Sequence, residues 1–248
     1  MERAELHFHL LPDVDDGPAD LDDAVELARL AFADGTSLVT VTPHVRDLLA
    51  AGILGELPGR VREVQDALDA AGVALALRTG AELAHDDLPA LGDRQLDAMA
   101  QGPPGRRWVL IEAPLCGDAA GFLAATAELR ARGLGTLIAH PERCPELMLD
   151  DGAIAAERAA GARLQVNASS LTGRHGPAAR AWGIELLRSG RADLIASDAH
   201  RVTRPPLLSA ALAVLAGDGM PRSELERFVS AAPRALLAHG VAPLRRAA

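Results

Sequence analysis

The chain has 248 residues, a formal net charge of −9 and 49% hydrophobic residues, which is typical of a globular protein and not of a disordered, collagen-like or disulfide-stapled chain. It contains no Lys and no Tyr, so Schiff-base chemistry, pyridoxal phosphate attachment and the phosphate-loop lysine are excluded. With six aromatic residues and this acidic charge, it also lacks the basic field and stacking surfaces of a nucleic-acid binder, and no nucleic-acid partner is expected.

Short apolar runs separated by periodic segments predict a repeat of strands and helices. Several helix-like stretches end in a glycine that is followed by an apolar run, the pattern of a helix cap before a strand buried on both faces. The predicted strands are 6–9, 38–41, 73–77, 108–111, 136–139, 164–166 and 194–196, and the clearest predicted helices are 20–34, 60–71 and 121–132.

The repeat favours an α/β fold with parallel strands. Seven consecutive units are better explained by a closed or nearly closed (β/α)7 barrel than by an open sheet. No linker or composition break divides the chain, so we expect one domain spanning 1–248. Segment 84–107, which contains Gln101-Gly-Pro-Pro-Gly105, is expected to be a long irregular crossover.

Two features concern the cellular compartment. The N-terminal segment has no apolar run of signal-peptide length, and nowhere do 18 apolar residues follow one another. The two cysteines, Cys116 and Cys144, lack metal-ribbon spacing and suit a reducing compartment. We therefore expect a cytoplasmic protein without membrane insertion, in which both cysteines are bystanders.

Polar side chains follow the predicted strands at their carboxyl ends, where parallel α/β folds place their sites. His7 and His9 share one face of the first strand, and acceptors follow them on a turn that ends at Gly17. The candidate metal ligands are His7, His9, Asp16, His44, Glu82, Glu112, His140, Asp198 and His200.

For any one of these residues, a helix cap or a satisfied core polar group is an equally good interpretation. Five His and four carboxylates buried together without cations would, however, cost more than the stability of a whole domain. Imidazole and carboxylate ligands without thiolate suit Zn, Mn or Fe, and nine ligands exceed what one ion takes. We therefore expect two or three divalent ions. Three such ions would outweigh the charge of the four carboxylates and attract an anionic substrate.

Other polar residues lie close to these candidates along the chain. Arg143 and Arg204 carry guanidinium forks that match phosphate oxygens, the alternative being ordinary surface arginines. Asn167 and Ser169 share one face of the sixth predicted strand and either orient a water or a phosphate oxygen or serve in packing around the ligands. The remaining histidines, His85, His175 and His239, are interpreted as surface residues.

The motifs as a set resemble the PHP superfamily (polymerase and histidinol phosphatase), and within it the bacterial metal-dependent tyrosine-protein phosphatases of capsular and exopolysaccharide synthesis. The resemblance runs from His7 to about Pro206. It rests on the segment from His7 to Pro18, Thr42-Pro-His44, Gly80-Ala-Glu82, Ile111-Glu112, Ala139-His-Pro-Glu-Arg143, Gln165-Val-Asn-Ala-Ser-Ser170, Ser197-Asp-Ala-His200 and Arg204-Pro-Pro206.

The resemblance implies a distorted (β/α)7 PHP barrel, usually loaded with manganese, with zinc or iron as alternatives. It implies one ion among His7, His9, Glu82 and Asp198, a second among Glu82, Glu112 and His140, and a third among Asp16, His44 and His200. It also implies that Arg143 and Arg204 bind phosphate.

The expected activity is therefore phosphotyrosine hydrolysis by hydroxide that the metal ions activate. The expected partner is a tyrosine-phosphorylated protein, a bacterial tyrosine kinase of polysaccharide synthesis, because a chain without Tyr cannot be its own substrate. Two alternatives stay open. One is a small-molecule phosphatase similar to histidinol-phosphatase, and the other is a regulator that binds a phosphorylated tail without turnover.

Overall fold

The computed structural model describes residues 2–241, in which strands and helices alternate along the chain and every strand pair is parallel. The strands are β1 (Arg3–Phe8), β2 (Thr36–Val41), β3 (Ala76–Thr79), β4 (Glu82–Leu83), β5 (Trp108–Glu112), β6 (Gly135–Ala139), β7 (Arg163–Asn167) and β8 (Leu194–Ala196). They form one sheet in the order β1-β2-β3 and a second in the order β4-β5-β6-β7-β8.

Parallel bridges join the two sheets at the carboxyl ends of the strands. Phe8 pairs with Ala199 beyond β8, and His44 beyond β2 pairs with Glu82 of β4. The bonds that close the ring run between main-chain atoms, as from His9 N–H to the Ala199 carbonyl at 2.9 Å. The predicted parallel α/β barrel is therefore confirmed, and its closure lies at the end where the candidate ligands gather.

The third predicted strand is wrong in its extent. The run 73–77 leads into β3, which continues to Thr79, and a break at Gly80 separates it from β4. Only glycine fits at position 80, because the Cβ of any other residue would lie 2.6 Å from the Thr40 methyl group and clash with it. The Gln101 side chain fills the gap between β3 and β5 by donating to the Thr79 carbonyl, while its main chain pairs with Trp108.

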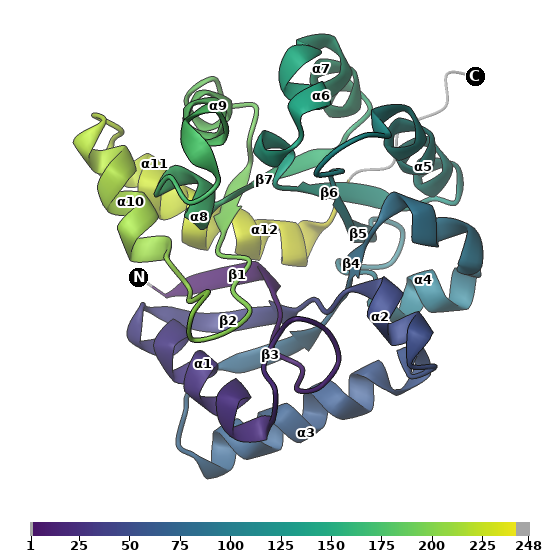
Figure 1. Cartoon of the computed structure of the whole chain (residues 1–248), viewed down its shortest axis with the longest axis vertical. Coiled ribbons are helices and arrows are strands. Elements are labelled where there is room, and N and C mark those ends of the chain that lie inside the picture. The colour runs from purple at the N-terminus through teal and green to yellow at the C-terminus, as the bar shows by residue number, and fades with distance from the viewer. Residues whose placement is uncertain (1, 242–248) are drawn as a thin grey trace.

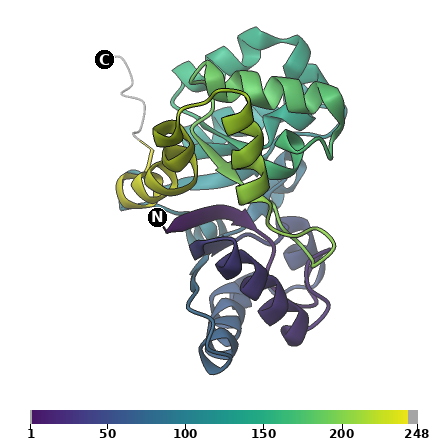
Figure 2. The same cartoon turned by 90° about the vertical axis from the view of Figure 1, so that its left-hand side faces the viewer.

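Helices surround the strands on the outside of the barrel (Figure 1), and in the side view β1 runs between the α1 and α3 helices below and the helices of the C-terminal half above (Figure 2). They are α1 (Leu21–Ala33), α2 (Val45–Ala50), α3 (Leu57–Ala70), α4 (Asp93–Met99), α5 (Ala119–Ala131), α6 (Pro145–Leu149), α7 (Asp151–Ala159), α8 (Ala168–Leu171), α9 (Gly176–Arg188), α10 (Leu208–Gly217), α11 (Arg222–Glu226) and α12 (Ala232–His239). Shorter turns are η1 (Leu54–Glu56), η2 (His85–Ala90), η3 (Pro141–Arg143) and the π-helical η4 (Arg227–Ala231).

The three clearest predicted helices are confirmed as α1, α3 and α5, each within a few residues at its ends. The prediction of an irregular segment 84–107 is wrong, because this segment contains η2 and α4. Helix α4 begins after Gly92, whose N–H donates to the side chain of Gln95 at 2.8 Å. Helices this short have too few turns for an apolar period to identify them in the sequence.

A bulge in β1 places two successive side chains inside the barrel. Three steps on β1, from Glu5 to Phe8, face two steps on β2, from Val39 to Val41. Leu6 therefore joins the apolar cluster of the barrel interior, while His7, the next residue, reaches the carboxylate of Glu82.

Helix α12, yellow in Figure 1, closes the opposite end of the barrel. Leu236 and Val241 pack in the interior cluster with Trp108, and the Trp108 indole N–H donates to the Leu236 carbonyl at 3.3 Å. The apolar interior is thus sealed at the amino ends of the strands, which leaves the polar end as the open one.

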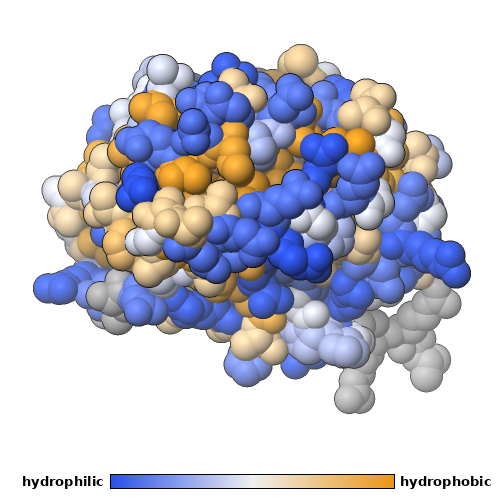
Figure 3. All heavy atoms as spheres, turned by 90° about the horizontal axis from the view of Figure 1, so that it is seen from below, coloured by the Kyte–Doolittle hydropathy of each residue, from blue (hydrophilic) through white to orange (hydrophobic). Residues whose placement is uncertain are grey.

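Hydrophobic residues reach the surface seen from below in several small groups among hydrophilic ones (Figure 3). Within residues 2–241, no helix has the length and apolar character needed to cross a bilayer.

Candidate metal centre

The structure brings the nine candidate ligands together at the open end of the barrel. They form three groups, and within each group the potential ligand atoms lie within 4.8 Å of one another. The groups are His7, His9, Glu82 and Asp198; Glu82, Glu112 and His140; and His9, Asp16, His44 and His200. Two of them match the sets that the resemblance implies, and the third adds His9 to its set.

The first group is fully enclosed, and its four atoms have the spacing of a coordination shell. His7 Nε2 lies 3.2 Å from both His9 Nε2 and Glu82 Oε2. It lies 3.3 Å from Asp198 Oδ1. Four ligands about 2.1 Å from one ion at tetrahedral corners lie about 3.4 Å apart. One ring nitrogen carries at most one proton and cannot satisfy three such neighbours, so this donor set fits a divalent cation.

The second group combines two carboxylates with one imidazole. His140 Nε2 lies 3.1 Å from Glu82 Oε1 and 3.8 Å from Glu112 Oε1. Burial and the neighbouring charge of Glu82 raise the pKa of Glu112 to about 7. Burial and the charge of Arg143 lower the pKa of His140 to about 4, so its imidazole is neutral at neutral pH, as a metal ligand must be.

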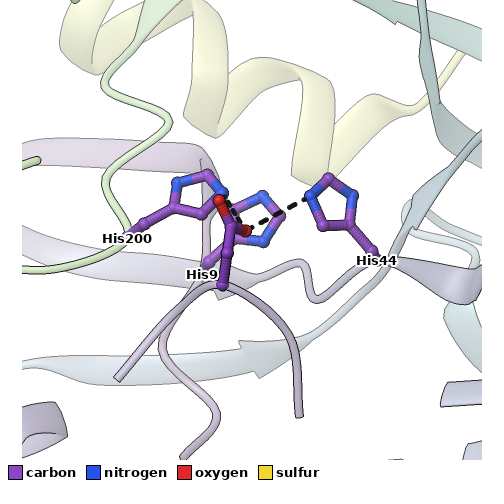
Figure 4. Close-up of side chains that lie close together, drawn as sticks. His9, His44 and His200 are labelled. Carbon is purple, nitrogen blue, oxygen red and sulfur yellow. Dashed lines mark ion pairs between the residues drawn. The ribbon is translucent and has the colours of Figure 1, made fainter. Parts of the chain in front are cut away.

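The third group opens toward solvent through Asp16, whose side chain is 55% exposed. Asp16 Oδ1 lies 3.0 Å from His200 Nε2 and 3.6 Å from His44 Nε2. In Figure 4 these two ion pairs meet at one carboxylate. The rings of His9 and His200 stack on each other, with centroids 3.7 Å apart. Hydrogen bonds from His200 and His44 hold the pKa of Asp16 well below its usual range.

Two ligand positions have left-handed backbone that only glycine adopts freely. His140 has a φ of 35° and Asp198 a φ of 53°. Such conformations cost about 1–3 kcal/mol each and persist where the surroundings impose them. His140 comes directly after β6, and Asp198 comes two residues after the end of β8. Both side chains belong to the ligand groups described above.

Asp15, which the sequence interpretation passed over in favour of Asp16, orients two ligands. Its Oδ2 atom accepts from His9 Nδ1 at 2.8 Å and from the His44 N–H at 3.0 Å, and its Oδ1 accepts from the Gly17 N–H. Although burial opposes it, the charge of His9 lowers the pKa of Asp15 to about 2. A carboxylate behind a ligand imidazole fixes the ring orientation. The signal in the sequence is the acidic run before Gly17.

Gln165 is a second residue that the sequence interpretation missed. Its Oε1 lies 3.0 Å from His7 Nδ1, and its amide donates to Asn167 Oδ1 at 2.7 Å. Asn167 in turn donates to Asp198 Oδ2 at 2.8 Å, so it lies against a ligand of the first group. Gln165 and Asn167 are two residues apart on β7 and therefore share one face of the strand. This spacing is the sequence signal that could have identified Gln165.

Both candidate arginines lie at the open end. Arg143 Nη1 is 3.3 Å from Asp198 Oδ2, and Arg204 Nη2 is 3.6 Å from the same oxygen. Arg204 also meets Asp16 Oδ2 at 2.7 Å. Two guanidinium groups therefore converge on the outer oxygen of a carboxylate whose other oxygen faces His7 and His9.

Two further predictions concern Ser169 and His175. The main-chain carbonyl of Ser169 accepts from the Thr172 hydroxyl and the Arg174 N–H. The next residue, Ser170, places its hydroxyl 2.9 Å from His175 Nδ1. The interpretation of His175 as a surface residue is therefore wrong, because it is half-buried and held by a side chain. Cys116 and Cys144 are free thiols, the first exposed and the second buried.

Comparison with known proteins adds family and fold information. A family model described as capsular polysaccharide synthesis, CpsB/CapC, matches residues 3–237. The tyrosine-protein phosphatase YwqE of Bacillus subtilis is 30% identical over 207 residues, covering 80% of this chain and 77% of that protein.

Two solved structures share the fold. One belongs to a study of YwqE from Bacillus subtilis and CpsB from Streptococcus pneumoniae, described as metal-dependent tyrosine phosphatases. It matches with a TM-score of 0.79 and 24% identity over 98% of this chain and 100% of the other. The phosphotriesterase homology protein from Escherichia coli, with phosphate in its active site, matches with a TM-score of 0.61 and 12% identity over 94% and 97%.

Proposed function

Because the chain belongs to the CpsB/CapC family of capsular polysaccharide synthesis, we propose that it is a metal-dependent protein-tyrosine phosphatase. The observation that carries the proposal is the convergence of three His and carboxylate groups and two arginines at one end of the barrel. The nitrogen and oxygen donors of the three groups would hold the ions, and the arginines would bind the phosphate.

The three groups would hold two or three divalent ions, for which we propose manganese, with zinc and iron as alternatives of suitable ligand preference. When bound, such ions lower the pKa of water from near 16 to about 7 and neutralise charge on a phosphoryl group. Glu82 belongs to the first and second groups and His9 to the first and third, so the first group shares one residue with each of the other two.

Arg143 and Arg204 would hold the phosphoryl oxygens. Each guanidinium carries five N–H donors, of which the contacts with Asp198 and Asp16 use a part. A planar fork grips a phosphoryl group through two parallel hydrogen bonds, and this grip strengthens as negative charge spreads over the equatorial oxygens during hydrolysis.

The proposed substrate is phosphotyrosine on another protein, a tyrosine kinase of polysaccharide synthesis, because the chain itself has no Tyr. A cavity of about 240 Å³ lies beside the second group, and His44, Glu82 and Glu112 are among the residues that line it. We propose the cytoplasm as the compartment, which suits two cysteines that form no disulfide.

Kinetics on a phosphotyrosine peptide, a phosphoserine peptide and histidinol phosphate test this substrate. We expect the highest kcat/KM for the phosphotyrosine peptide. A preference of about a hundredfold for histidinol phosphate, equal to about 2.7 kcal/mol, would assign the chain to the small-molecule phosphatases. Binding of the phosphotyrosine peptide without release of phosphate would assign it to the non-catalytic regulators.

A further inference from the structure

Glu142 lies between His140 and Arg143 in the turn η3, and its side chain is fully buried. Oε1 of this carboxylate accepts from the Asn167 N–H at 2.9 Å and from the Ser170 hydroxyl at 2.7 Å. The turn that carries a candidate ligand and a candidate phosphate-binding arginine is thus tied to the end of β7 and to α8.

Neither of these bonds is an ion pair. Among residues 2–241, no cation lies within ion-pair distance of Glu142, and its second oxygen, Oε2, is buried without a hydrogen-bond donor. Packing leaves little freedom, since a Cβ added to Gly183 on α9 would lie 3.4 Å from the Glu142 Cγ atom. The carboxylate therefore contributes through the geometry of Oε1, which accepts both bonds whether Oε2 carries a proton or not.

These bonds also fix the state of His175. The single proton of the Ser170 hydroxyl goes to Glu142, so at 2.9 Å His175 Nδ1 must be the donor to the Ser170 oxygen. His175 is held as the Nδ1–H tautomer. The loop before it is tied to the loop of Arg204, because Arg174 donates to the Thr203 carbonyl at 3.1 Å.

We propose that Glu142 is a positioning residue for the phosphatase site: its Oε1 atom, through Asn167 and Ser170, holds the turn that presents Arg143 and His140. The inference rests on the proposed function only for the role of Arg143. Glu142 does not touch the substrate and acts through Arg143, the next residue of the same turn, whose guanidinium contacts Asp198.

Two substitutions separate geometry from charge. Glu142→Gln keeps an oxygen that accepts both bonds, and Glu142→Leu removes the acceptor at similar size. We expect kcat of the metal-loaded enzyme on para-nitrophenyl phosphate to fall at least tenfold in Glu142→Leu, with KM within threefold, and to stay within threefold of wild type in Glu142→Gln. Equal loss in both variants, or full activity of Glu142→Leu, overturns the proposal.

A double-mutant cycle distinguishes positioning from general destabilisation. If Glu142 acts through Arg143, Glu142→Leu combined with Arg143→Lys lowers kcat no more than about twofold below the worse single variant. Multiplication of the two losses overturns the proposal. Glu157→Leu is the matched control, because Glu157 is also a buried carboxylate but pairs with Arg130 away from the site; its kcat should not change. Should Glu142→Leu fail to fold, Ser170→Ala replaces it in the same cycle.

Nitrogen-15 NMR of His175 gives a readout that does not depend on activity. In the zinc-loaded protein we expect the Nδ1–H tautomer in wild type and Glu142→Gln, with signals assigned by their loss in His175→Gln. In Glu142→Leu the Ser170 proton is free and the Nε2–H tautomer should appear. An Nε2–H tautomer in wild type overturns the inference, whereas absence of phosphatase activity in wild type overturns only the proposed function.

Discussion

Asp198 connects the metal-binding part of the site with the arginines through its two carboxylate oxygens. Oδ1 lies 3.3 Å from His7 Nε2, and Oδ2 accepts from Asn167 at 2.8 Å and faces Arg143 at 3.3 Å. Although burial opposes it, the charge of His7 keeps the pKa of Asp198 below its usual range. The residue therefore stays ionised, and the amide of Asn167 binds the oxygen that faces the arginines.

Arg143 should act on turnover and not on folding. Its side chain is 19% exposed, and its guanidinium contacts Asp198 at the metal-binding end of the barrel. Arg143→Lys keeps the charge and loses the planar fork, so we expect kcat to fall at least about tenfold. Metal content and Tm should stay at wild-type values. An unchanged kcat would return Arg143 to the class of surface arginines.

Asp15 should set metal affinity without touching the metal. Asp15→Ala removes the acceptor behind His9 and His44, and loss of such an outer carboxylate typically costs 10–100-fold in affinity. Titration of the metal-free protein with Mn²⁺ measures this. The control is Asp20→Ala, which removes only the N-cap of α1. Equal Mn²⁺ affinities in wild type and Asp15→Ala would show that Asp15 has no such role.

His175 gives a pH dependence of stability with a definite sign. Burial and the charge of Arg143 lower the pKa of His175 to about 4, against about 6.5 in the unfolded chain. The unfolded state binds more protons between these values, so stability falls as the pH drops from about 6.5 to about 4. Between pH 6.5 and 4, the Tm of His175→Gln should therefore fall by about 2 °C less than the Tm of wild type. The difference is small because solvent screens the half-exposed imidazole. Parallel thermal melts of both metal-free proteins test this; identical losses would contradict it.

The candidate ligands could be predicted from the sequence because they follow predicted strands, and parallel strands bring their carboxyl ends together. It could not supply Asp15 behind His9, Gln165 behind His7 or Ser170 beside His175. The acidic run before Gly17 and the spacing of Gln165 and Asn167 mark these residues as candidates but do not fix their partners. Those depend on side-chain direction and, for Gln165 and His7, on packing between segments 158 residues apart.

Among the elements, the bulge in β1 and the split between β3 and β4 determine the shape of the site. The bulge directs His7 inward beside Leu6, and the split lets Glu82 reach both the first and the second group. The sequence predicted the strands as apolar runs. It did not predict the split, because the insertion of the Gln101 side chain between β3 and β5 is a contact across 22 residues with no local pattern.

Helix α12 should contribute to stability and not to catalysis. Leu236 is 7% exposed and packs in the barrel interior, opposite the metal centre. Leu236→Ala should lower the free energy of unfolding by about 2–4 kcal/mol. Denaturant titration measures this, and kcat of the folded protein should remain unchanged. Leu149→Ala, at a residue 90% exposed, is the control. A loss of kcat in folded Leu236→Ala would mean that the closed end communicates with the site.

For the whole molecule, closure of the barrel concentrates four carboxylates and five imidazoles at one end of a protein with net charge −9. Bound cations would offset the carboxylates there and make this end attractive to a phosphorylated side chain while the rest of the acidic surface repels it. The α/β barrel was predictable from the sequence because its repeat is periodic. The single domain over 1–248 and the identity of the ions stay predictions.

Phosphate release from a phosphotyrosine peptide, before and after Mn²⁺ is added to chelator-treated protein, tests the central claim most directly. The metal-free protein should be inactive, Mn²⁺ should restore activity to wild type, and His140→Ala, which removes the imidazole of the second group, should not recover it. Equal activity of the metal-free and the Mn²⁺-loaded protein, or full activity of His140→Ala, would contradict the account.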